Sequence, residues 1–240
     1  MTAAVLIGVG VGPGDPELLT VRALRVLREA DRVFAPSLAV DAVGRAESIV
    51  RGADPAIAVE RVVFAVNGGA TARAGAHDLA ASRVVDCLAA GERVAFVTLG
   101  DPNVYSTFHH LASAVQRLRP GTPVETVAGI MAFQDLATRA GVVVVDGTER
   151  LEVVSAADGL EAVHAALAGT DAAVVVYKGG RHLPAIAERL ARVGRLEGAV
   201  FGELLGLPGQ RVVAVSDAAA RPAAYLATVI VPPARAAGDP

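Results

Sequence analysis

The stretch LGDPNVYST, residues 99–107, indicates the fold class of this chain. It follows the apolar run VAFVT at 94–98, which is typical of a strand buried on both faces, and it precedes a segment with helical spacing. Open α/β sheets bind their ligands at such strand-to-helix turns. Gly100 suits a tight turn, Asp101 a helix N-cap and Pro102 the first helical position. A capped turn without any function would contain the same residues.

A second turn, GPGDP at residues 12–16, repeats the Gly-Asp-Pro triplet directly after the apolar run 4–9. Two strand ends with similar turns at one sheet edge would face one site. The alternating glycines of this region approach the Gly-x-Gly-x-x-Gly pattern of dinucleotide sites. Pro13, however, removes a backbone donor, and the expected second strand at 32–36 does not end on an acidic residue for a ribose. A dinucleotide is therefore the weaker alternative.

Composition excludes several classes of protein. The chain has 240 residues, of which 53% are hydrophobic and 20% charged, enough for one large core or two smaller ones. A net charge of -3 provides no basic field for a nucleic acid. No apolar run approaches the roughly 18 residues of a membrane span, and the single Cys87 cannot form an internal disulfide. We expect a cytoplasmic protein without a nucleic-acid or membrane partner.

Expected strands and helices alternate along the whole chain, which predicts an α/β fold. The expected strands are 4–9, 32–36, 58–66, 94–98, 124–127, 142–145, 151–155, 172–177 and 198–202, and the segments 211–215 and 225–231 would form an antiparallel edge or hairpin. The expected helices are 16–30, 43–51, 73–90, 104–118, 128–140, 160–167 and 180–193. The cluster RPGTP at 119–123 predicts a boundary between domains 1–120 and 121–240, with a ligand cleft between them.

Four spaced motifs carry a resemblance to a known family. They are GVGVGPGDPELLT at 8–20, GDPNVYSTF at 100–108, VAGI at 127–130 and VYKG at 176–179. Together they resemble the tetrapyrrole methylases, enzymes that use S-adenosylmethionine. The resemblance covers nearly the whole chain. It implies the two-domain fold of that family, with a mostly parallel N-terminal sheet, a mixed C-terminal sheet and the cofactor in the cleft between.

Within the family, two segments point to one reaction. The motif at 100–108 and the segment DGTERL at 146–151 are most similar to members that methylate C-20 of precorrin-2, or of its cobalt complex, in corrin synthesis. Family members with other substrates, such as uroporphyrinogen III, are one alternative. A noncatalytic module that only binds the cofactor is another.

The resemblance also implies the residues of a cofactor site. These are Pro13, Leu99, Gly100, Asp101, Val104, Ser106, Thr107, Met131, Ala132, Lys178 and Gly206. Two positions depart from the family pattern: Ala128 replaces a proline, and Met131 replaces a small hydroxyl residue. A backbone contact to the cofactor would then replace a side-chain contact at this point.

Methyl transfer from a sulfonium places few chemical demands on the protein. Positive charge disperses during the transfer, so the site must position the substrate and exclude water, and no metal is expected. His109 and His110 lack a third ligand at useful spacing. The proton that leaves the methylated carbon needs an acceptor, and Tyr105 and Asp101 are the candidates, beside others that include water.

The substrate of such an enzyme carries many carboxylates, which require cations. Arg45 and Arg181 are candidates, although a solvated helix face is the commoner role of any one arginine. Lys178 is the only lysine of the chain and follows an apolar strand, which favours a position where the planar guanidinium does not fit. Because paired α/β folds often assemble symmetrically, we expect a homodimer.

Overall fold

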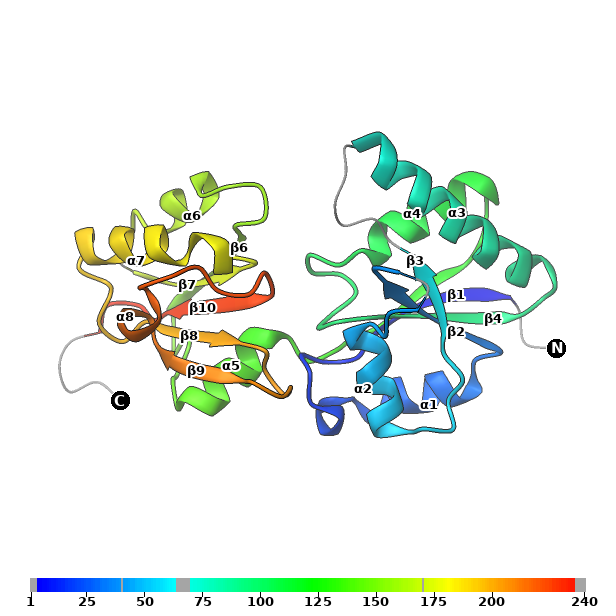
Figure 1. Cartoon of the computed structure of the whole chain (residues 1–240), viewed down its shortest axis with the longest axis horizontal. Helices are drawn as coiled ribbons and strands as arrows, with labels where there is room; N and C mark the ends of the chain where they lie inside the picture. The colour runs from blue at the N-terminus through cyan, green and yellow to red at the C-terminus, as the bar shows by residue number, and fades with distance from the viewer. Residues whose placement is uncertain (1–3, 40, 64–69, 170, 236–240) are drawn as a thin grey trace. The chain divides into compact units, whose positions relative to one another are not determined.

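The structure is a computed structural model that describes residues 4–39, 41–63, 70–169 and 171–235; the side chains of residues 70–77 lie outside the described part. The chain divides into two units, Met1–Met131 and Ala132–Pro240 (Figure 1). Each unit is built on its own five-stranded sheet. The predicted α/β class is thereby confirmed.

The first unit contains a parallel sheet with the order β3-β2-β4-β1-β5. The strands are β1 (Val5–Gly10), β2 (Arg32–Ser37), β3 (Glu60–Val63), β4 (Arg93–Thr98) and β5 (Val124–Val127). Every pairing is parallel, including β1 with β4 and β1 with β5. All five carboxyl ends therefore lie at one edge, as the sequence predicted for the turns after β1 and β4.

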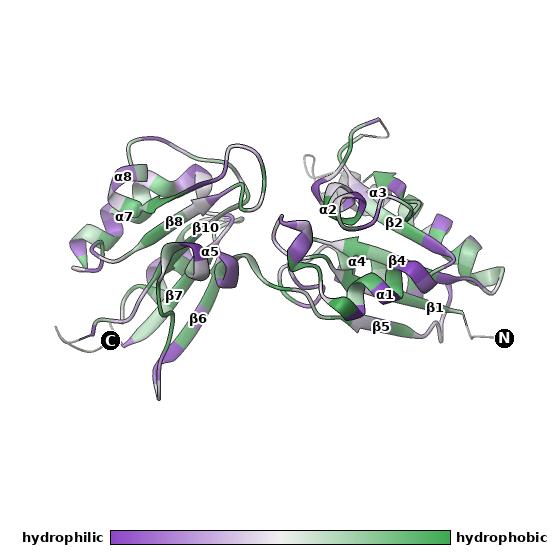
Figure 2. Cartoon of the chain, turned by 90° about the horizontal axis from the view of Figure 1, so that it is seen from below, coloured by the Kyte–Doolittle hydropathy of each residue, from purple (hydrophilic) through white to green (hydrophobic). Residues whose placement is uncertain are grey.

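Helices cover both faces of this sheet (Figure 1). They are η1 (Pro16–Leu18), α1 (Val21–Glu29), α2 (Arg45–Ala53), α3 (Ala70–Ala89) and α4 (Phe108–Leu118). Ile7 and Val9 of β1 pack with α1 and α2 in one buried cluster, whereas Leu6 packs with α3 and α4 in another. Figure 2 shows β1 and β4 as mainly hydrophobic, as expected for strands covered on both faces.

This layering sets the place of the site. The chain leaves β1 toward α1 on one face and leaves the neighbouring β4 toward α4 on the other face. Such a reversal between adjacent parallel strands opens a crevice at their carboxyl ends, where α/β proteins bind ligands. The turns at residues 10–14 and 99–107 lie at this point.

The second unit contains a mixed sheet with the order β6-β7-β10-β8-β9. The strands are β6 (Arg150–Ser155), β7 (Ala172–Tyr177), β8 (Val200–Glu203), β9 (Arg211–Ala214) and β10 (Ala227–Val231). β6 and β7 are parallel, and β10 runs antiparallel between β7 and β8. The mixed C-terminal sheet is thereby confirmed. Of the two arrangements predicted for the last two strands, the hairpin is wrong, because β8 lies between β9 and β10, whereas β9 does form an antiparallel edge strand.

Two helical layers enclose this second sheet. Its helices are α5 (Ala132–Ala140), α6 (Glu161–Ala166), η2 (Gly180–His182), α7 (Leu183–Arg192) and α8 (Val215–Ala218). Leu136 of α5 packs with Val175 and Ile230 on one face. Val176 and Val229 pack with α6, α7 and α8 on the other.

The boundary between the units differs from the prediction. Contacts divide the chain after Met131, not after residue 120. The reason is β5, which pairs with β1 and so belongs to the first sheet. The Pro/Gly cluster at 119–123 is only the turn between α4 and β5.

Three local predictions are also wrong. The apolar segment 142–145 forms no strand, and its Val143 carbonyl accepts a hydrogen bond from Arg235. The first long helix begins after Thr20, whose Oγ1 accepts the Ala23 N–H at 3.1 Å, whereas Asp15 caps only the short η1. α4 begins at Phe108, four residues later than predicted, because the segment before it is held in a turn described below.

Candidate active site

Backbone hydrogen bonds join the turns that follow β1 and β4. The N–H of Gly100 donates to the Gly12 carbonyl at 2.9 Å, and the N–H of Val11 donates to the Thr98 carbonyl at 2.9 Å. The two Gly-Asp-Pro turns therefore begin side by side, as the sequence predicted.

Three glycines allow the turns after β1, β4 and β5 to meet. A Cβ on Gly129 would lie 2.1 Å from the Gly100 carbonyl oxygen, and a Cβ on Gly10 would lie 2.4 Å from the same atom. Gly100 itself has a φ of +63°, a conformation that glycine adopts without strain. The three turns thus pack backbone against backbone at this point.

The carboxylate of Asp101 ties two of these turns together. Its Oδ1 accepts the Asn103 N–H at 2.8 Å, and its Oδ2 accepts the Gly129 N–H at 3.1 Å. Asp101 is therefore not the N-cap of α4, and Pro102 is not the first residue of that helix. The side chain instead fixes the turn after β4 against the turn after β5.

Residues 101–107 fold back onto β4 before α4 begins. Ser106 Oγ lies 2.9 Å from Thr98 Oγ1 and accepts the Phe108 N–H at 3.0 Å. Phe108 packs where a Cβ on Gly8 would come within 2.5 Å of its ring. Ser106 and Thr107 consequently precede the helix, and the prediction that they lie in its first turn is wrong.

Strained backbone coincides with the expected site. Among the described residues, three that are not glycine have a positive φ: Tyr105 (49°), Lys178 (58°) and Leu204 (53°). Such strain costs about 1–3 kcal/mol per residue and gathers at functional sites. Two of the three were predicted site residues. Leu204 was not, because no sequence signal marks a leucine for this conformation.

The other predicted residues of the first unit lie at or near the same edge. Pro13 and Leu99 are half-buried, and Val104 and Tyr105 are exposed. The Cα of Met131 lies 4.0 Å from the Cβ position of Gly100.

Arg45 is the half-buried first residue of α2. Its helix follows the carboxyl end of β2, at the edge that carries the turns. No ion pair joins Arg45 to a residue in the described ranges.

In the second unit, Lys178 follows β7 at the edge where β8 ends. Its N–H donates to the Ala227 carbonyl at 3.1 Å, and Ala227 pairs with Glu203 of β8. Burial lowers the pKa of the Lys178 ammonium below its usual value, while the nearby Asp158 carboxylate acts in the opposite direction.

Three further predicted residues also belong to the second unit. Arg181 is exposed and donates to the Ala157 carbonyl and to His182. Gly206 has a φ of +69°, and its N–H donates to Gln210 Oε1 at 2.8 Å. Ala132 is the first residue of α5.

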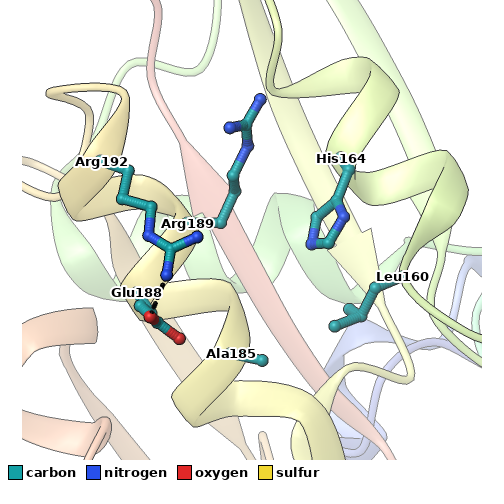
Figure 3. A pocket seen from close by; sticks show the side chains of 6 residues that line it. All are labelled: Leu160, His164, Ala185, Glu188, Arg189 and Arg192. Carbon is teal, nitrogen blue, oxygen red and sulfur yellow. Dashed lines mark hydrogen bonds and ion pairs between the residues drawn. The ribbon is translucent and has the colours of Figure 1, made fainter.

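A separate surface cavity of about 360 Å³ lies at helices α6 and α7 (Figure 3). Its lining consists of Leu160, His164, Ala185, Glu188, Arg189 and Arg192. Arg192 is paired with Glu188, and none of the predicted site residues contributes to the lining. Within the described ranges, no group of three metal-binding side chains is found and no helix could cross a bilayer.

The fold and the glycine-lined turns define a class: α/β proteins of two sheets with packed glycine turns at the carboxyl ends of the first. Comparison with known proteins is more specific. The model of the family described as Tetrapyrrole (Corrin/Porphyrin) Methylases matches residues 5–219. The chain belongs to this family.

Relatives with assigned names agree with this membership. A precorrin-2 C(20)-methyltransferase from Sinorhizobium sp is 35% identical over 236 residues, covering 95% of this chain and 94% of the relative. A cobalt-precorrin-2 C(20)-methyltransferase from Salmonella typhimurium is 31% identical and covers 94% and 95%. The uroporphyrin-III C-methyltransferase of Thermus thermophilus, solved with S-adenosyl homocysteine, has a TM-score of 0.67 at 24% identity and covers 95% and 97%; this likeness concerns the fold.

Proposed function

We propose that this chain is an S-adenosylmethionine-dependent methyltransferase that acts at C-20 of precorrin-2 or of its cobalt complex. The observation that carries the proposal is the nearly full-length similarity to relatives that are named for this reaction, at 35% and 31% identity. The similarity includes both units, so it covers every residue of the expected site.

The packing of the turns supports this proposal. Backbone atoms around the Gly100 carbonyl already occupy the Cβ positions of Gly10 and Gly129, so the three turns pack against one another without side chains between them. We assign the binding to two sets of residues. They are Pro13, Leu99, Gly100, Val104, Ser106, Thr107 and Met131 in the first unit, and Ala132, Lys178 and Gly206 in the second.

When bound, the cofactor would supply the methyl group for C-20, and its sulfur would keep the electron pair of the broken bond. The part of the protein would be to hold the two reactants in contact, at about 3–3.5 Å, and to exclude water. C-20 then loses its proton. Because both oxygens of Asp101 accept backbone amides, we assign Asp101 a positioning role and leave Tyr105, on its strained turn, as the side chain proposed to accept this proton.

Two cations are proposed to bind the substrate carboxylates. Arg45 has no ion-pair partner in the described part of its unit, and Arg181 is exposed beside Ala157. Arg61 and Arg150 are already paired with Glu47 and Asp171, so we do not assign them to the substrate.

The test is incubation with methyl-labelled S-adenosylmethionine and precorrin-2, with and without cobalt, followed by NMR of the product. We expect label on C-20 and loss of its proton. Label at another ring carbon, or only with uroporphyrinogen III, would favour another member of the family. Binding of the cofactor without transfer would favour a noncatalytic module.

We also propose a cytoplasmic homodimer that binds no nucleic acid. The single Cys87 and the net charge of -3 support the compartment and the absence of a nucleic-acid partner. Sedimentation equilibrium tests the dimer: a single species at the monomer mass, 24.3 kDa, at micromolar concentration would overturn it.

A further inference from the structure

Tyr177 is the last residue of β7 and directly precedes the strained Lys178. Its hydroxyl oxygen accepts the N–H of Phe133 at 3.2 Å, across 44 residues of sequence. Phe133 is the second residue of α5, and the first N–H groups of a helix have no partner inside the helix. Tyr177 therefore caps α5 from the neighbouring sheet.

Hydrogen bonds and strand pairing also hold the backbone of Tyr177. Its carbonyl accepts the Ala156 N–H at 2.8 Å, and it pairs with Thr228 of β10 and with Ser155 of β6. Its ring packs in the cluster that contains Phe133 and Leu136 of α5. One residue thus connects the sheet edge before Lys178 to the start of the helix that Ala132 opens.

We propose that Tyr177 is a positioning residue for the cofactor: its hydroxyl fixes the N-terminus of α5, and thereby Ala132, relative to Lys178. The inference rests on the proposed function, because Ala132 and Lys178 are assigned to the cofactor there. Without the hydroxyl, the Phe133 N–H loses its partner and the first turn of α5 loosens. Binding then has to order this turn, which lowers the affinity.

The variant Tyr177→Phe tests this inference, because it keeps the ring in its cluster and removes the hydroxyl that accepts the Phe133 N–H. Tyr225→Phe is the matched control, since it makes the same change at a tyrosine that is 45% exposed. Calorimetry with S-adenosyl homocysteine and steady-state kinetics give the readouts. For Tyr177→Phe we expect about a five-fold increase in Kd and in the KM for S-adenosylmethionine, with kcat within two-fold. Tyr225→Phe should match the wild type.

Amide hydrogen exchange provides a second readout that needs no ligand. The Phe133 amide should exchange faster in Tyr177→Phe and at the wild-type rate in Tyr225→Phe. An unchanged Kd in Tyr177→Phe, or a lower kcat and Tm with unchanged KM, would overturn the positioning role. Failure of the wild type itself to bind S-adenosyl homocysteine would instead overturn the proposed function, and the exchange rates would still test the cap.

Discussion

The Oδ2 atom of Asp101 accepts the backbone N–H of Gly129 at 3.1 Å, although the two residues are 28 positions apart in the sequence. The other carboxylate oxygen accepts the Asn103 N–H at 2.8 Å. Together the two hydrogen bonds hold the turn after β4 against the turn after β5. The candidate site at this edge thus depends on the Asp101 carboxylate, which the sequence alone predicts to be a helix N-cap.

Substitution of Asp101 should show that holding the two turns together matters more for binding than the local cap made by Asp15 in the turn after β1. The side chain in Asp101→Asn has only one oxygen, whereas the N–H groups of Asn103 and Gly129 each need an acceptor. We therefore expect the Kd for S-adenosyl homocysteine, measured by calorimetry, to rise about ten-fold. Asp15→Asn is the control, because Asp15 occupies the same triplet and accepts the Glu17 N–H at 3.0 Å within η1. Equal losses in the two variants would contradict a specific role for Asp101.

A methyl group on Gly129 should break the contact among the three turns. Gly129→Ala places a Cβ 2.1 Å from the Gly100 oxygen, and such overpacking costs about 1–3 kcal/mol of unfolding free energy. Urea denaturation gives this quantity. Gly169→Ala is the control. Its Cβ would lie 3.3 Å from a carboxylate oxygen of Asp171, a side chain that can move, so its unfolding free energy should stay within about 0.5 kcal/mol of the wild type. A stable Gly129→Ala variant would show that the turns are not closely packed.

Replacing Lys178 by glycine should leave thermal stability unchanged or higher while it weakens binding. The φ of 58° strains any residue with a Cβ, so Lys178→Gly should leave Tm unchanged or higher, by the equivalent of about 1 kcal/mol. The same variant loses the ammonium and should raise the KM for cofactor or substrate. Lys178→Arg keeps both the charge and the strain but not the compact head group. Unchanged kinetics in both variants would remove Lys178 from the site.

Glu47 should make the stability of the first unit depend on pH. Its side chain is fully buried and pairs with Arg61 at 2.6 Å and Arg51 at 2.8 Å. The hydrogen bond from Arg61, chiefly, holds the pKa of Glu47 below its ordinary 4.5, against the effect of burial. A lowered folded-state pKa stabilises the protein above the unfolded value, and this contribution disappears as the pH falls through the folded value.

Glu47→Gln should therefore cost about 3 kcal/mol of unfolding free energy at pH 7, and the difference from wild type should shrink below pH 4.5. Denaturant titrations at several pH values measure it. Glu188→Gln is the control: its ion pair with Arg192 is exposed on both sides, so the variant should change stability by less than about 1 kcal/mol. A pH-independent difference for Glu47→Gln would refute the ionic origin.

Apolar runs in the sequence correctly predicted some strands and wrongly predicted another. The run 172–177 matches β7 residue by residue, since six consecutive apolar or aromatic residues suit a strand buried on both faces. The run 142–145 is equally apolar, but it enters no strand pairing with the part of the chain that the structure describes, and it forms no strand. Apolar character shows that a segment can be buried, whereas strand formation requires a neighbour to pair with.

Residue patterns along the chain were enough to predict the alternation of strands and helices, the glycine turns after β1 and β4, and a resemblance that suggests where the site lies. The alternation follows from hydrophobic periodicity, and the turns follow from glycines at positions where other residues would be strained. Both are local properties of the sequence. The three-dimensional fold was needed to show that Asp101 binds Gly129, that β5 joins the first sheet, that β10 lies between β7 and β8, and that Tyr177 caps α5. Each of these is a hydrogen-bond partnership between distant segments, and the free energy that selects it comes from the packing of the whole unit.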